Sequence, residues 1–297
     1  MAGKRKIGRF PFRVSIPEDY LRRTVRNALR EDLSEGDATT RLVVAPETRG
    51  SAVVRLKDDG VVAGLRVFRA VFKEFDPATR VTSRVKEGAR CKRGTVLARV
   101  TGRSRSILAC ERVALNFLQR LSGTATATRI LVDRVSGTGV KILDTRKTTP
   151  GLRPLEKYAV ALGGGFNHRP SLADLALVKD NHIRAAGGLR EALRRLGRTK
   201  HGLLIEVEVA PDVDLESLKD LDVDILMFDN WPRERLSKAI ARVRLFPARP
   251  LVEVSGRIRP ENVRALALTR PDFISVGYIT HSAPSLDISL DFEDRPA

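Results

Sequence analysis

The sequence predicts an α/β protein in which an N-terminal α+β sandwich domain precedes a partial parallel α/β barrel of about six strands. Between residues 50 and 102, short apolar runs punctuated by glycines are typical of a small, mostly antiparallel layer. Beyond Gly139, strand-like and helix-like patterns alternate, which indicates parallel strands joined by right-handed crossovers. We place the domains at 1–115 and 116–284, with a tail, 285–297, that could return to the first.

The first domain opens on an amphipathic pattern. Its apolar spacing predicts a helix over residues 17–33, and the polar run after it predicts a loop over 34–40. A second helix, 65–75, is expected to bury one face that includes Phe75. Strand patterns fall at 51–56, 61–64, 81–85 and 95–100.

Residues 106–135 read as one or two long helices with apolar residues nearly all round, which predicts burial. Glu111 and Arg112 interrupt this pattern, because a buried charge is costly unless it is paired. Two interpretations remain open: an internal ion pair, or an Arg112 side chain that projects into an active site.

Six strand patterns define the second domain, and helical patterns follow each of them except the last. Nearly every strand ends in a charged or polar residue. Such convergence favours a barrel, which collects its ligands at the carboxyl-terminal rim, over an open sheet, where only a few strands contribute. The strands fall at 140–145, 175–179, 203–209, 224–229, 251–255 and 272–277.

Basic residues gather after the first two of these strands. Arg146 and Lys147 follow the first, Lys179 ends the second, and His168 and Arg169 come between them. Carboxyl ends of parallel strands share one rim, so these side chains predict a basic pocket for a small, strongly anionic substrate.

Acidic residues end the next two strands. Glu206 and Glu208 alternate with apolar residues, so both point to one side of their strand, which we take as the barrel interior. Asp229 ends the neighbouring strand and is expected beside Glu208. Acids in a barrel interior need basic partners or a metal.

Several ordered motifs resemble the quinolinate phosphoribosyltransferase family almost residue for residue. They are EDLSEGDATT, TRKTTPG, LEKYAV, GGGFNHR, VKDNH and SVGYITHS, and they span nearly the whole chain. The resemblance implies transfer of a phosphoribosyl group from phosphoribosyl pyrophosphate to quinolinate. Pyrophosphate and carbon dioxide leave, and nicotinate mononucleotide is formed for NAD biosynthesis.

The resemblance also implies roles for the rim residues. Lys147 and Lys179 would meet the departing pyrophosphate, while Glu208 and Asp229 would bind ribose hydroxyls directly or through Mg²⁺. Quinolinate would bind the arginines and His168, and Arg112 would come from the neighbouring subunit of a homodimer. The quinolinate set is Arg112, Arg146, His168 and Arg169.

For the 5′-phosphate, the resemblance points to small residues at the ends of the last two strands. Ser255, Gly256 and Gly277 match the family positions, and His281 lies close behind. Arg257 departs from the pattern, since glycine or asparagine usually follows SG in the family. We expect Arg257 to add a contact to the phosphate.

Composition narrows the alternatives. The chain carries 54 basic and 36 acidic residues, a formal charge of +18, yet its aromatic residues are scarce and not interleaved with the basic ones. Nucleic-acid binding is therefore disfavoured, although a degenerate enzyme fold that binds nucleic acid stays an alternative. A second alternative is a paralogue of the molybdenum-operon type, or an enzyme that uses nicotinate.

Cys91 and Cys110 have no metal or redox spacing, and no secretion signal is apparent, so a cytoplasmic location is expected.

Overall fold

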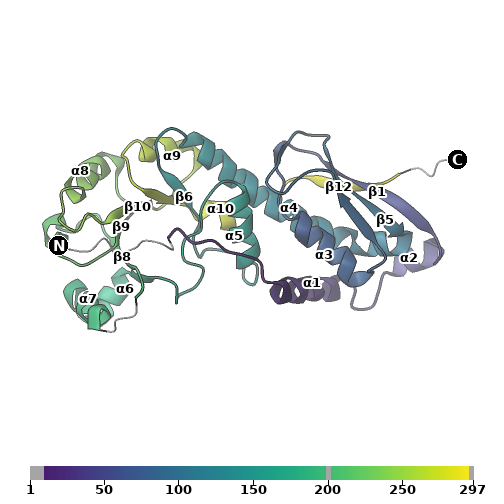
Figure 1. Ribbon diagram of the computed structural model, residues 1–297, viewed down its shortest axis with the longest axis horizontal. Coiled ribbons are helices and arrows are strands. Elements are labelled where there is room, and N and C mark those ends of the chain that lie inside the picture. The colour runs from purple at the N-terminus through teal and green to yellow at the C-terminus, as the bar shows by residue number, and fades with distance from the viewer. Residues whose placement is uncertain (1–9, 199–201, 294–297) are drawn as a thin grey trace. The chain divides into compact units, whose positions relative to one another are not determined.

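The computed structural model describes residues 10–198 and 202–293, and within them the chain divides into two units. Within the described residues, the barrel unit contains 10–13, 130–148, 165–198 and 202–281, and the sheet unit contains 14–129, 149–164 and 282–293. The grey traces in Figure 1 mark the stretches outside the described residues, where His201 lies. Among the described residues, no helix has the length and hydropathy needed to cross a membrane.

The sheet unit is built on four antiparallel strands in the order β12-β1-β5-β3 (Figure 1). Strand β12, near the end of the chain, pairs with β1 from Ala52–Phe292 to Leu56–Ile288. Long aliphatic side chains and Phe68 and Phe72 form the core between this sheet and its helices. The strands are β1 (Arg49–Leu56), β2 (Gly60–Val61), β3 (Arg80–Ser83), β4 (Arg90–Cys91), β5 (Val96–Arg103) and β12 (Ile288–Phe292).

The helices of this unit follow the predicted pattern with three differences. The polar stretch after α1 is not all loop, because Asp37 accepts the Thr40 amide at 2.8 Å and starts a short helix. Phe75 is 44% exposed, since it lies on the last turn and its ring leaves the buried face. Arg112 is exposed rather than buried. The helices are α1 (Glu18–Asp32), α2 (Ala38–Val43), α3 (Leu65–Phe75), α4 (Ser104–Arg134) and α5 (Arg153–Leu162).

Six parallel strands form the barrel unit, in the order β6-β11-β10-β9-β8-β7. From β7 to β11 each strand lies beside its neighbour in the chain, and the last, β11, pairs with the first, β6. This order is that of a barrel rather than of a doubly wound sheet, where the order reverses at a switch point. The strands are β6 (Lys141–Leu143), β7 (Ala176–Val178), β8 (Ile205–Val209), β9 (Ile225–Asp229), β10 (Leu251–Ser255) and β11 (Phe273–Ser275).

The ladder is open between β6 and β7 within the described residues, and an irregular segment lies against β6 at this opening. Phe166 donates its amide to Ile142 O at 2.8 Å and accepts the Asp144 amide at 3.0 Å. Asn167 accepts the Phe12 amide at 2.8 Å on the other side. These bonds carry the chain into the barrel interior just before His168.

The sequence pattern predicts a helix after every strand except the last, and the structure differs from this pattern at two connections. A 3-10 helix, η1 (Leu215–Leu218), replaces an α-helix after β8, and a four-residue helix, α10, follows β11. In Figure 1, α8 and α9 lie outside β9 and β10. The helices of this unit are α6 (Asp180–Ala186), α7 (Leu189–Arg198), α8 (Arg233–Val243), α9 (Pro260–Ala267) and α10 (Tyr278–His281).

Candidate active site

A cavity of about 240 Å³ lies at the carboxyl ends of the barrel strands. Basic side chains enter it after β6 and β7, and acidic ones after β8 and β9, as the sequence pattern predicts. Its lining brings together eight of the predicted site residues. They are Arg146, Lys147, His168, Arg169, Lys179, Glu208, Asp229 and Ser255.

The basic side of the cavity contains two arginines that lie close enough for the positive charge of one to act on the other. Arg169 is 5% exposed, and its Nη1 donates to Leu175 O at 2.8 Å. Burial, and then the charge of Arg146, lowers the pKa of Arg169. A desolvated guanidinium with a like charge beside it is short of negative charge, so an anion that binds both arginines would relieve that deficit.

The acidic side is already engaged within the protein. Lys179 forms an ion pair with Glu208. Asp229 Oδ2 accepts a hydrogen bond from Asn230 Nδ2 at 2.6 Å, and Asn230 has a left-handed backbone with φ of 56°. Both carboxylates are partly exposed and also border a second cavity of about 480 Å³.

A chain of polar contacts holds the residues that enter at the barrel opening. Asp144 accepts the His168 amide at 2.8 Å and the Asn167 side chain at 2.7 Å. His168 Nδ1 accepts the Arg169 amide at 2.8 Å, and its Nε2 lies 3.0 Å from Glu206 Oε2. The His168 ring is therefore hydrogen-bonded through Nδ1, while its Nε2 faces a buried carboxyl group.

The loops after β10 and β11 have the backbone that the predicted phosphate site requires. Gly256 has φ of 101°, and a Cβ there would lie 2.3 Å from Asn230 Oδ1. Arg257 follows with φ of 50°, a conformation in which glycine is favoured, and its side chain is exposed. A Cβ on Gly277 would lie 3.0 Å from the His281 ring and 3.1 Å from Lys147 Cδ, so these three residues are neighbours.

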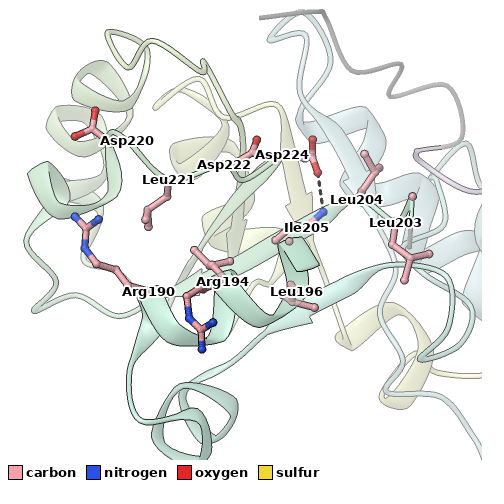
Figure 2. A pocket seen from close by; sticks show the side chains of 13 residues that line it. Arg190, Arg194, Leu196, Leu203, Leu204, Ile205, Asp220, Leu221, Asp222 and Asp224 are labelled. Carbon is pink, nitrogen blue, oxygen red and sulfur yellow. Dashed lines mark hydrogen bonds between the residues drawn. The ribbon is translucent and has the colours of Figure 1, made fainter. Parts of the chain in front are cut away.

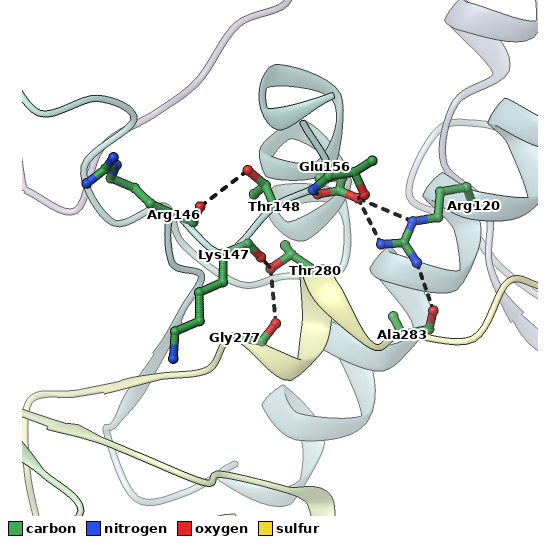
Figure 3. A network of polar contacts seen from close by, with 9 residues as sticks. Arg120, Arg146, Lys147, Thr148, Glu156, Gly277, Thr280 and Ala283 are labelled. Carbon is green, nitrogen blue, oxygen red and sulfur yellow. Dashed lines mark hydrogen bonds and ion pairs between the residues drawn. The ribbon is translucent and has the colours of Figure 1, made fainter. Parts of the chain in front are cut away.

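Two sets of bonds fix the ends of the TRKTT loop, and Figure 3 shows both. In the barrel unit, Thr280 Oγ1 donates to Lys147 O at 2.7 Å. In the sheet unit, buried Glu156 accepts the Thr149 amide at 3.0 Å and pairs with Arg120 at 2.9 Å. Arg120 also donates to Ala283 O at 3.0 Å.

Arg112 lies in the sheet unit, so it is not among the residues that line the barrel-end cavity. It projects from α4 and lines a separate cavity of about 300 Å³ with Arg120 and Asn116. The neighbouring Glu111 is half buried, and burial raises its pKa.

A larger cavity, of about 600 Å³, lies where β8 and β9 begin (Figure 2). Asp224 there accepts the Ile205 amide at 2.7 Å, which joins the starts of the two strands. Arg190 and Arg194 border it from α7. Asp220, Asp222 and Asp224 border it as well, but it lies where the strands begin and not at the carboxyl-terminal rim, so we assign it no catalytic role.

Sequence reasoning missed several residues of the site. Glu253 lines the cavity and is fully buried, and its alternation with valines in LVEVS is the same signal that identified Glu208. Asn230 and Ser275 gave no such signal. His182 lies in α6, where its Nδ1 accepts the Lys179 amide at 3.0 Å and caps the helix.

An α/β barrel with arginines, lysines and carboxylates converging at its carboxyl rim defines an enzyme that acts on small anionic substrates. Two family models match the chain: "Quinolinate phosphoribosyl transferase, N-terminal domain" over residues 37–122 and the corresponding C-terminal domain over 124–291. The chain therefore belongs to the quinolinate phosphoribosyltransferase family.

Individual relatives agree. A nicotinate-nucleotide pyrophosphorylase (carboxylating) from Mycobacterium leprae is 41% identical over 276 residues, which are 92% of this chain and 97% of the relative. A quinolinate phosphoribosyltransferase (decarboxylating) from Nicotiana glauca is 36% identical over 95% of this chain and 85% of its own. The solved nicotinate-nucleotide pyrophosphorylase from Francisella tularensis superposes with a TM-score of 0.89, at 37% identity, over 94% of this chain and 98% of its own. Human nicotinic acid phosphoribosyltransferase, at 14% identity and a TM-score of 0.58 over 93% of this chain and 74% of its own, shares the fold alone.

Proposed function

We propose that this protein transfers the phosphoribosyl group of phosphoribosyl pyrophosphate to quinolinate and decarboxylates the adduct to nicotinate mononucleotide, a step of NAD biosynthesis. One observation carries the proposal: buried or half-buried arginines and carboxylates line opposite sides of one cavity. The arginines suit an aromatic dicarboxylate, and the carboxylates suit a ribosyl group that becomes positive as it transfers.

Quinolinate is assigned to the basic side. Its two adjacent carboxylates match two planar guanidinium forks, and Arg146 and Arg169 present such forks from neighbouring segments. His168 belongs to the same group. A monocarboxylate such as nicotinate would leave one buried arginine without a counter-charge, which disfavours it as the acceptor.

Phosphoribosyl pyrophosphate is assigned to the acidic side and the neighbouring loops. Lys147 and Lys179 meet the pyrophosphate, and Glu208 and Asp229 meet the ribose. The 5′-phosphate lies against main-chain N–H groups that small residues leave accessible. The residues assigned to the 5′-phosphate are Ser255, Gly256, Arg257, Gly277 and His281.

The reaction depends on electrostatic stabilisation of the charges that develop during transfer more than on a proton donor. As the C1–oxygen bond to pyrophosphate breaks, the ribosyl carbon becomes positive, and Glu208 and Asp229 stabilise it while the pyridine nitrogen forms the new bond. The lysines take up the negative charge of the leaving pyrophosphate. Carbon dioxide then leaves, and the electron pair of the broken bond stays on the ring carbon, where the adjacent positive nitrogen stabilises it until a proton replaces the carboxylate.

Magnesium is compatible with the residues present. Glu208 and Asp229 offer carboxylate oxygens, the ligands that Mg²⁺ prefers, at the border of two adjoining cavities. They would hold the ion directly or through water, and the ion would add positive charge for the pyrophosphate. Lys179 would then share Glu208 with the metal.

We further propose a homodimer in which Arg112 reaches the active site of the partner subunit. An exposed arginine on a long helix, beside a cavity of its own unit, supports this role. Mixing Arg112→Ala with Arg169→Ala protein should restore about a quarter of wild-type activity, because half of the reassorted dimers are hybrids with one intact site. No recovery after verified subunit exchange would exclude donation across the interface. A cytoplasmic location is proposed on the strength of the two free cysteines.

The proposed reaction is tested with purified protein, Mg²⁺, phosphoribosyl pyrophosphate and either quinolinate or nicotinate. Mononucleotide and carbon dioxide should form in equal amounts from quinolinate, and nicotinate should give little product. Turnover of nicotinate at a comparable rate would overturn the assignment of the acceptor. Retention on DNA without any turnover would instead revive the nucleic-acid alternative.

A further inference from the structure

Three buried side chains meet beside the barrel-end cavity, and two of them, Glu206 and Glu253, have no part in the roles assigned above. His168 is 5% exposed, and Glu206 and Glu253 are 0% exposed. His168 Nε2 lies 3.0 Å from Glu206 Oε2 and 3.5 Å from Glu253 Oε2. Two buried carboxyls this close need a hydrogen-bond donor, a shared proton or a metal ion between them.

A metal ion is one candidate, because the three ligand atoms lie within 4.8 Å of one another. The hydrogen bond at the other imidazole nitrogen, Nδ1, argues against a metal ion. Nδ1 accepts the Arg169 amide at 2.8 Å, so Nδ1 carries no proton and Nε2 must carry one. A histidine that binds a metal has the opposite arrangement, with one nitrogen on the metal and a proton donated from the other. Arg169 and Lys179 also place positive charge close to Glu206.

We propose that Glu206 and Glu253 are positioning residues that hold the Nε2–H edge of His168 and thereby set the place of Arg169. Through Nδ1, the imidazole fixes the main chain of Arg169, and the guanidinium is fixed separately at Leu175 O. His168 itself is held at its amide by Asp144. The glutamates thus act on quinolinate through His168 and Arg169, and the inference rests on the proposed function in taking quinolinate as the ligand of Arg169.

The need for such support follows from the charges around Arg169. Burial and the neighbouring Arg146 both disfavour a charged guanidinium, whereas Glu206 favours it. Without the glutamate pair, Arg169 would lose an attractive charge and the fixed ring behind its main chain. A small displacement of a substrate-binding group is enough to reduce turnover severely.

The experiment compares two substitutions at Glu206. In Glu206→Gln the amide oxygen can still accept the Nε2 proton, whereas Glu206→Met keeps the length and removes the acceptor. Glu206→Met should raise the KM for quinolinate about 100-fold, and Glu206→Gln less than about tenfold. The KM for phosphoribosyl pyrophosphate should rise far less than the KM for quinolinate in both, because Arg169 does not serve that substrate and Glu206 acts on Lys179 only through its charge. Glu216→Met, the same change at an exposed position on η1, is the matched control.

A second measurement reads the histidine directly. The chain has four histidines, so ¹⁵N spectra of the imidazoles are simple to assign with His168→Gln as the reference. The wild-type protein and Glu206→Gln should show His168 as the neutral Nε2–H tautomer, and Glu206→Met should show a mixture. This measurement needs no substrate, so a protein without quinolinate turnover, which would overturn the proposed function, still gives an answer here.

Four single results, and one combination of results described after them, would overturn the inference. The single results are an unchanged quinolinate KM in Glu206→Met, an equal loss in Glu206→Gln, an Nδ1–H tautomer in the wild type, and one tightly bound divalent metal per chain in the purified protein. Equal increases in both KM values together with a lowered unfolding midpoint would also overturn it, since they indicate general damage to the barrel.

Discussion

Replacing Gly256 by alanine should damage both stability and substrate binding, for two separable reasons. The first is the backbone: φ of 101° is a conformation that costs an alanine about 1–2 kcal/mol. The second is crowding, because the new Cβ would lie 2.3 Å from Asn230 Oδ1 and 2.7 Å from the Asn230 main-chain nitrogen. Overpacking of this kind costs about 1–3 kcal/mol, so we expect a total loss of about 2–5 kcal/mol.

Gly139→Ala separates the two causes. Gly139 also has a left-handed backbone, with φ of 79°, but nothing lies within 4 Å of its added Cβ. Urea unfolding should therefore show about 1–2 kcal/mol lost in Gly139→Ala and the larger loss in Gly256→Ala. The difference between the two variants measures the crowding at Asn230.

Catalysis should follow the same division. A displaced Asn230 releases the 2.6 Å bond that orients Asp229, so Gly256→Ala should raise the KM for phosphoribosyl pyrophosphate while Gly139→Ala leaves it unchanged. Adding Asn230→Gly should restore stability only in part, since the main-chain nitrogen still crowds the Cβ. The reasoning is refuted if the two alanine variants are equally stable and bind this substrate equally well.

Three further predictions address the site and the core. Arg146→Ala and Arg169→Ala should each lose about 2–5 kcal/mol of transition-state stabilisation, read as kcat/KM for quinolinate, with an unchanged unfolding midpoint; near-normal kinetics would refute their role. Arg257→Gly should remove the backbone strain of an arginine with positive φ and raise the free energy of unfolding by up to about 1 kcal/mol. The same change should raise the KM for phosphoribosyl pyrophosphate about tenfold, and an unchanged KM would show that Arg257 is not part of the phosphate site. Burial, with a smaller effect of Asp76, raises the pKa of the Cys110 thiol to about 12, so its contribution to stability is complete below the ordinary value of 9.0 and is lost above it. Relative to Cys110→Ala, the wild type should lose at most about 1.4 kcal/mol per pH unit between these values; parallel unfolding curves would contradict the assignment.

The sequence predicts the strands of the barrel and the charged residues after them, because strand period, burial and chain order are local properties. Arg146, Lys147, Lys179, Glu208 and Asp229 reach one cavity for the reason given by the pattern: carboxyl ends of parallel strands meet. The same alternation marks Glu253, and its importance becomes visible only once β10 is placed beside the opening that admits His168.

Other features depend on contacts between distant residues and cannot be predicted from the sequence. The left-handed Asn230 is stabilised by the main chain of Ser255, to which it donates at 3.0 Å. The expected burial of Arg112 is wrong because the apolar pattern of α4 does not record which face remains uncovered. A helix was not expected after β11, where four residues suffice to turn the chain beside Lys147.

The central claim is that the barrel-end cavity binds quinolinate through its arginines, and a structure of the quinolinate complex tests it most directly. We predict the two carboxylates on Arg146 and Arg169, with His168 Nε2 still directed at Glu206 and Glu253. Quinolinate bound at the cavity where β8 and β9 begin, or bound between the carboxylates with the arginines turned away, would contradict the account.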